Sequence, residues 1–136
     1  MTRLPDWQDR LTALVAHAHR QPFAWGTHDC CLWAADAVLA LTGRDPAADL
    51  RGRYADATGA MRALRAMGGL LGAGRRAGIA LAGPGHARDG DVALVSDGRR
   101  PMLAVHAGAV WLVAATGGLH ALPVSAARVT WGVGHA

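Results

Sequence analysis

The sequence contains neither lysine nor glutamate: all 14 basic residues are arginines and all 10 acidic residues are aspartates. Such one-sided usage, together with abundant alanine and glycine, is typical of a GC-rich genome and requires no selection for nucleic acid. The net charge of +4 and the pI near 10.4 are therefore weak evidence for DNA or RNA binding. Aromatic residues make up only 5% of the chain, too few for a platform on which bases stack, and no more than two arginines are adjacent. We predict no nucleic-acid partner, although a positive chain favours anionic surroundings such as bacterial cell wall.

Long apolar runs and separated cysteines are absent as well. No apolar run approaches the roughly 20 residues of a membrane-spanning helix, and the charged start MTRLPDWQDR lacks the apolar core of a secretory signal. The only cysteines, Cys30 and Cys31, are adjacent and are expected to be free thiols, because neighbouring cysteines form a strained disulfide. The 136 residues, without repeat or linker, predict one soluble domain over residues 1–136, made in the bacterial cytoplasm.

The first half of the chain has helical periodicity. Apolar residues recur at three- and four-residue spacing over residues 4–18, which predicts a first helix. A second helix is predicted over about residues 30–41, with Asp29 as its N-cap, and a third over about residues 57–67.

The second half has the pattern of strands. Residues 70–90 are glycine-rich and show no clear period, and short apolar runs separated by turn residues follow. These runs are residues 91–95, 102–107, 109–115, 119–124 and 129–133. Helices followed by an antiparallel meander indicate an α+β fold.

The segment Phe-Ala-Trp-Gly-Thr-His-Asp-Cys-Cys offers a candidate nucleophile. Cysteine attacks as the thiolate, and the first turn of a helix, where Cys30 is expected, stabilises an anion through its unpaired N–H groups and dipole. The Cys30 N–H is also placed to contribute to an oxyanion hole. The four residues Trp25, Gly26, His28 and Asp29 are the candidate substrate-binding residues, since Gly26 lets backbone approach a substrate closely. The charge of Asp29 opposes thiolate formation.

The same segment has two other interpretations. Free cysteine is among the most buried residue types, so a helix that begins Asp-Cys-Cys is also what a packed core requires. Zinc binding would need a second, spaced pair of ligands beside His28, Cys30 and Cys31, and the sequence offers none. We expect no metal and no cofactor.

At this point the motifs resemble a known family, the NlpC-type peptidoglycan peptidases of the NlpC/p60 superfamily. Trp25-Gly26 and Asp29-Cys30 at the head of a helix carry the likeness. It is closest to the small NlpC-like proteins of phage and prophage tail modules. Further similar segments are Pro22–Cys30, Asp45–Tyr54, Gly90–Leu94 (like that family's first core strand) and Pro123–Arg128.

The resemblance implies a papain-like fold, with N-terminal helices packed on a C-terminal antiparallel sheet and Cys30 as the nucleophile. Active members of the superfamily need a histidine on the strand after the first core strand and a polar residue beyond it. If Gly108 is the hairpin glycine, Met102 falls at the position of the base and Ala114 near that of the orienting group. If His106-Ala107-Gly108 is the family's His-x-Gly, His106 is the base and His120 orients it.

Hairpin symmetry favours the first of these registers. Residues opposed across a hairpin are symmetric about its turn. Residues 102 and 114 are centred on Gly108, a good turn residue, whereas residues 106 and 120 are centred on Val113, inside an apolar run. The favoured register predicts that the base is missing, although His106 shares a strand face with Met102 and remains a candidate.

Two functions therefore stay open. The first is a pseudoenzyme in the virion tail, a tail-tip or baseplate component that docks near the wall onto a hub or other tail protein. The second is an active cysteine peptidase that hydrolyses peptidoglycan, with Cys30 attacking the carbonyl and a histidine moving the proton.

Overall fold

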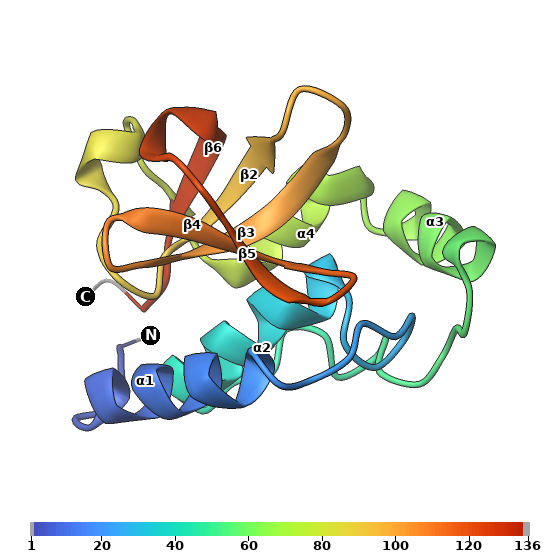
Figure 1. The fold of residues 1–136 in the computed structure, drawn as a ribbon, viewed down its shortest axis with the longest axis horizontal. Coiled ribbons are helices and arrows are strands. Elements are labelled where there is room, and N and C mark those ends of the chain that lie inside the picture. Colours follow the sequence, from blue (N-terminus) through green and yellow to red (C-terminus); the bar gives the residue numbers. More distant parts are fainter. Residues whose placement is uncertain (1, 135–136) are drawn as a thin grey trace.

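The structure, a computed structural model, describes residues 2–134 and has the predicted α+β architecture (Figure 1). Its helices are α1 (Trp7–Ala18), α2 (Cys30–Thr42), α3 (Ala57–Ala66) and α4 (Gly69–Ala77). Its strands are β1 (Ile79–Ala80), β2 (Val92–Ser96), β3 (Pro101–Ala107), β4 (Val110–Ala115), β5 (Gly118–Leu122) and β6 (Ala127–Gly132). Within residues 2–134 no helix is long and apolar enough to cross a membrane.

Helix α4 was not predicted, because glycines interrupt its sequence. Gly72 and Gly74 lie within the helix, at positions where a side chain would clash with neighbouring atoms. A Cβ on Gly74 would lie 2.3 Å from the Trp131 ring, and one on Gly72 would lie 1.8 Å from the Met67 carbonyl oxygen. The three predicted helices are confirmed to within a few residues.

The sheet is entirely antiparallel, in the order β1-β6-β2-β3-β4-β5. Strands β2 to β5 form the predicted meander. The simple meander is wrong for the last strand, because β6 returns across the sheet to pair with β2. The Val133 N–H, which follows β6, donates to the Asp91 carboxylate before β2 at 2.9 Å and holds that return.

The two faces of the sheet have separate cores. Leu103, Val105, Leu112 and Ala114 belong to the face that packs against the helices, where Trp33 of α2 is fully buried. Figure 1 shows α1 and α2 running along this side of the sheet. The other face carries a smaller cluster of Ala93, Val95, Met102, Ala104, Trp111, Val113 and Ala126.

The β3–β4 hairpin turns at two residues, Gly108 and Ala109, with φ of +61° and +68°. Val105 therefore pairs with Leu112 and His106 with Trp111. This register is centred half a residue beyond Gly108, which corrects both predicted registers. Ala114 lies on the face opposite to Met102, and Val113 lies within β4, where it pairs with His120.

We predict that Ala109→Gly stabilises the protein by about 1 kcal/mol, because a side chain is disfavoured at positive φ and glycine is not. Ala16→Gly is the matched control, since Ala16 is exposed on α1 and glycine there costs about 1 kcal/mol. Urea unfolding of the two variants measures both effects. A loss of stability in both would show that the turn does not disfavour alanine.

Candidate active site

Cys30 is the first residue of α2, as predicted, and Asp29 is its N-cap. The Asp29 backbone is extended, and its carboxylate accepts a hydrogen bond from the Leu32 N–H at 3.0 Å. The helix thus begins at a defined residue, which places the thiol at the positive end of the helix dipole.

The Asp29 carboxylate also holds two loops. It accepts from the Gly26 N–H at 3.1 Å and from the Tyr54 hydroxyl at 2.6 Å, and Asp29 is only 2% exposed. Burial, and next the bond to Asp29, raise the pKa of Tyr54, so the phenol stays protonated and donates. Asp29 is an interior organising residue, and it does not present its carboxylate to a substrate as predicted.

Gly26 is required by the protein's own backbone. Its φ is +80°, and a Cβ there would lie 1.9 Å from the Tyr54 carbonyl oxygen. Its carbonyl accepts from the Gly52 N–H at 2.9 Å. The close approach that we assigned to a substrate is therefore made by residues 52–54. Trp25, half-buried and edge-on to Phe23 at 4.9 Å, is the predicted binding residue that keeps a partly exposed side chain.

The N-terminal turn of α2 lies where β3 and β4 separate. Their pairing ends at Val105 and Leu112. Beyond this point α2 supplies the partners: the Trp33 indole N–H donates to the Leu112 carbonyl at 2.9 Å, and the Leu103 N–H interacts with the Cys30 sulfur. Where the hydrogen bonds between β3 and β4 end, residues of α2 bind the two strands, and these contacts fix the position of Cys30 against the sheet.

The two cysteines differ in their electrostatic surroundings. The Cys31 thiol, and to a smaller extent the Leu103 N–H and the Arg100 charge, lower the pKa of Cys30 against the opposing effect of burial. The bond to Cys30, and then burial, raise the pKa of Cys31. Cys31 lines a small pocket of about 20 Å³, room for one water molecule. These effects favour the thiolate at Cys30 over that at Cys31.

The surroundings of Cys30 differ from those of a cysteine paired with an imidazole. Within residues 2–134 no hydrogen bond joins a histidine nitrogen to its sulfur, and the side chain packs instead against the cluster that contains Met102. Met102 is 7% exposed. The thiol thus has a thioether-containing apolar cluster beside it.

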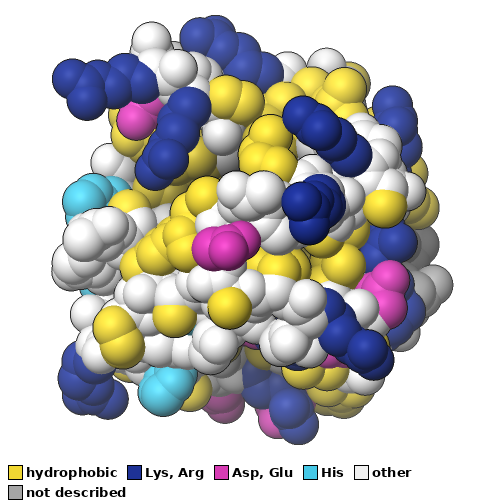
Figure 2. All heavy atoms as spheres, turned by 90° about the vertical axis from the view of Figure 1, so that its right-hand side faces the viewer, with side chains coloured by type: hydrophobic (Ala, Val, Ile, Leu, Met, Phe, Trp, Pro, Cys, Tyr) yellow, Lys and Arg dark blue, Asp and Glu magenta, His cyan; other side chains and the backbone are white. Residues whose placement is uncertain are grey.

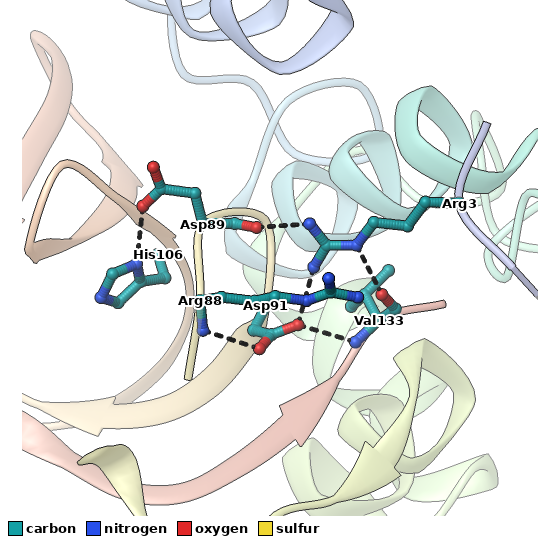
Figure 3. A network of polar contacts seen from close by, with 6 residues as sticks. All are labelled: Arg3, Arg88, Asp89, Asp91, His106 and Val133. Carbon is teal, nitrogen blue, oxygen red and sulfur yellow. Dashed lines mark hydrogen bonds and ion pairs between the residues drawn. The ribbon is translucent and has the colours of Figure 1, made fainter. Parts of the chain in front are cut away.

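His106 has a different partner from the one predicted. Its Nδ1 lies 2.9 Å from the Asp89 carboxylate (Figure 3). Its ring is edge-on to that of Trp111, with 5.0 Å between the ring centroids. The predicted orienting residue, His120, is exposed on β5, and β4 lies between the two histidines. The role of Asp89 was not predicted from the sequence. The only available signal is its position in the segment Arg-Asp-Gly-Asp before a strand. The same loop is anchored by the buried Arg3–Asp91 ion pair at 2.9 Å.

His28 is buried, contrary to its predicted role in substrate binding. It is 1% exposed, lies 6.2 Å from the Trp33 ring, and neither ring nitrogen has a hydrogen-bond partner. Burial lowers the pKa of His28, and the charges of Asp36 and Asp29 oppose this effect. The imidazole is neutral near pH 7 and is buried beside the Trp33 ring. Within residues 2–134 no group of three His, Cys or Asp side chains is arranged to hold a metal ion.

A protein-family model covers almost all of this architecture. It is described as a domain of unknown function, DUF6950, and it matches residues 2–133. The chain belongs to the DUF6950 family. No curated protein and no solved structure matches the chain.

We predict that Asp29→Ala destabilises this DUF6950 domain by about 3 to 5 kcal/mol. The substitution removes the helix cap and leaves the Gly26 N–H and the Tyr54 hydroxyl without their acceptor. Asp56→Ala is the matched control: Asp56 caps α3 with one bond to Gly59 at 2.8 Å, is exposed, and should cost about 1 kcal/mol. Chemical unfolding compares the two. Similar losses would show that the Tyr54 and Gly26 bonds contribute little.

A pH dependence follows from His28. Because its pKa is lower in the folded than in the unfolded state, its contribution to stability is complete above about pH 6.5 and is lost as the pH falls. The loss reaches at most about 1.4 kcal/mol per pH unit.

We therefore expect His28→Gln to have a flatter stability profile between pH 7.5 and 5 than the unmodified protein. The control is His19→Gln, which replaces an exposed histidine just after α1 and should leave the slope unchanged. Thermal melts across this pH range measure the difference. Parallel profiles for all three proteins would contradict it.

Proposed function

We propose that this DUF6950 domain has a papain-like fold of the NlpC type and is a structural component of a phage or prophage tail tip or baseplate. It keeps the helix-terminal cysteine, has little or no hydrolytic activity, and docks near the cell wall onto a hub or another tail protein. Its place is then the virion tail.

The proposed fold relation is supported by where the motif segments meet. Residues 22–30 and 45–54, which carry the resemblance, are joined by the bond between Asp29 and Tyr54. The thiol stands at the start of a helix that packs on an antiparallel sheet, and the segment Gly90–Leu94 leads into β2, the neighbour of β3. This is the arrangement that the resemblance implies.

The inactive assignment is supported by the lack, within residues 2–134, of a hydrogen bond between Cys30 and any histidine. Its thiol lies against the Met102 cluster and the Leu103 N–H. A thioether neither accepts the thiol proton nor donates one to a leaving amine. General acid–base help is typically worth about a hundred- to ten-thousand-fold in rate, so a thiolate alone gives weak hydrolysis.

One observation favours the alternative, an active cysteine peptidase. His106 is oriented by a carboxylate, as a catalytic imidazole is, and the Cys30 pKa is lowered. However, the Nδ1 of His106 is bound to Asp89, and within residues 2–134 no hydrogen bond joins the His106 ring to the Cys30 sulfur. Met102, four residues earlier on β3, belongs to the cluster against which Cys30 packs, so we favour the inactive assignment.

The test is digestion of purified peptidoglycan by the unmodified protein, Cys30→Ala and His106→Ala. We expect no soluble muropeptides above background from any of them. Brief iodoacetamide labelling, with Cys30 reacting before Cys31, verifies that the thiol is intact and reachable. Robust cleavage that both substitutions abolish would show that His106 is the base and that the enzyme assignment is right.

A further inference from the structure

The two edges of the sheet differ in length. β1 forms one edge and has two residues, whereas β5 forms the other and has five. Every second residue of an edge strand directs its N–H and C=O groups away from the sheet, where another strand can bind them. A two-residue edge offers few such groups, so β5 is the edge at which a further strand can be added.

β5 lacks most of the features by which edge strands avoid further pairing, namely charged side chains, proline, a β-bulge or a covering segment. Its sequence, Gly-Leu-His-Ala-Leu, contains no arginine, aspartate or proline, and its register with β4 is unbroken. His120 and Ala121 are exposed, and within residues 2–134 no backbone group outside β4 hydrogen-bonds to the β5 backbone. Gly118 is buried, and a Cβ on it would lie 3.1 Å from the His19 carbonyl oxygen, so the open part of the edge begins at Leu119.

The segment that contains β5 is electrically neutral. Residues 101–127 contain neither arginine nor aspartate, and the next longest stretch of this kind is residues 77–87. By contrast, Figure 2 shows arginine side chains spread over the end of the molecule that carries α3. Copies of a chain with a net charge of +4 repel each other, and β5 lies in the segment where two copies can meet without bringing like charges together.

The side chains of β5 are complementary to those of a second β5. If two copies lie antiparallel with their two-fold axis at His120, residues equally far before and after this position face each other. Leu119 is then opposite Ala121 of the second copy. Leu122 is opposite Gly118 of the second copy, so each leucine faces a small residue. Moving the axis by one residue to Leu119 would place two leucines directly opposite each other.

We propose that β5 pairs with β5 of a second copy of this chain, antiparallel and centred on His120, so that the two sheets continue into one. Main-chain hydrogen bonds hold the pair, and the two His120 side chains face each other across the two-fold axis. Five residues a side are fewer than the roughly 20 to 30 of a stable interface, so the homodimer is weak and forms at high local concentration. The inference goes beyond the proposed function and does not depend on whether Cys30 is reactive.

A second copy fits β5 better than other partners. An acidic partner requires basic side chains and a basic partner acidic ones, and residues 101–127 contain neither arginine nor aspartate. A bilayer requires a broad apolar face, whereas the exposed residues of β5 are His120 and Ala121. An unrelated neutral strand would have to match the alternation of leucines and small residues, which β5 of a second copy already matches.

The test measures self-association of the full chain by sedimentation velocity between about 10 µM and 1 mM, a range suited to a weak interface. We expect His120→Asp and His120→Arg, each alone, to associate about tenfold more weakly, because like charges then face each other. An equimolar mixture of the two variants should associate at least as tightly as the unmodified protein, because the facing charges are opposite. His120 is exposed, so both variants should fold, which thermal melts verify.

His86→Asp and His86→Arg are the matched controls. His86 is exposed in the short helix η1 (Pro84–His86), which contacts β6, and three strands lie between β6 and β5. These variants change the net charge equally and should not alter association, alone or mixed. Hydrogen exchange of residues 119–121 should slow as the concentration of the unmodified protein rises.

A protein that stays monomeric over the whole range would overturn the proposal. So would a mixture of the two His120 variants that associates no more tightly than either alone, because residue 120 would then not face its own copy. None of these outcomes involves peptidoglycan cleavage, so they are distinguishable from failure of the proposed function.

Discussion

The position of the candidate nucleophile depends on one buried carboxylate, that of Asp29. Burying a charge is costly unless hydrogen bonds replace its water, and here the Leu32 N–H, the Gly26 N–H and the Tyr54 hydroxyl do so. Each donor comes from a different part of the chain. The start of α2, the loop before it and the loop after it are thereby fixed to one point, and Cys30 is the next residue.

Local contacts of this kind can be predicted from the sequence, whereas contacts between distant parts of the chain could not. Caps act over three residues, so Asp29 and Asp56 mark their helices in the local pattern. In α4, by contrast, Gly74 is required by the close approach of Trp131, which is far along the chain. The local pattern of glycines alone predicts a loop there. The place of β6 beside β2 is likewise a long-range pairing.

The hairpin register shows the same limit at a finer scale. Gly108 was a correct turn signal, but alanine rarely adopts the positive φ that Ala109 has, so the second turn residue carried no signal. A half-residue error was enough to put Ala114 on the wrong face of the sheet. The pairing of His106 with Asp89 was unpredictable for a related reason, since the loop that contains Asp89 is positioned by the Arg3–Asp91 ion pair.

The residues that fix the position of the Cys30 thiol are different from those that could take part in its chemistry. Asp29, Gly26 and Tyr54 hold the N-terminal turn of α2, and none of them is placed to move a proton during hydrolysis. Met102 only fills space in an apolar cluster beside the thiol, a requirement that many side chains meet. The base position is therefore free to change without loss of the fold, because the bonds that locate Cys30 do not pass through it. Such a domain keeps its helix-terminal thiol whatever residue stands beside it, because Asp29 and its three donors fix the position of Cys30.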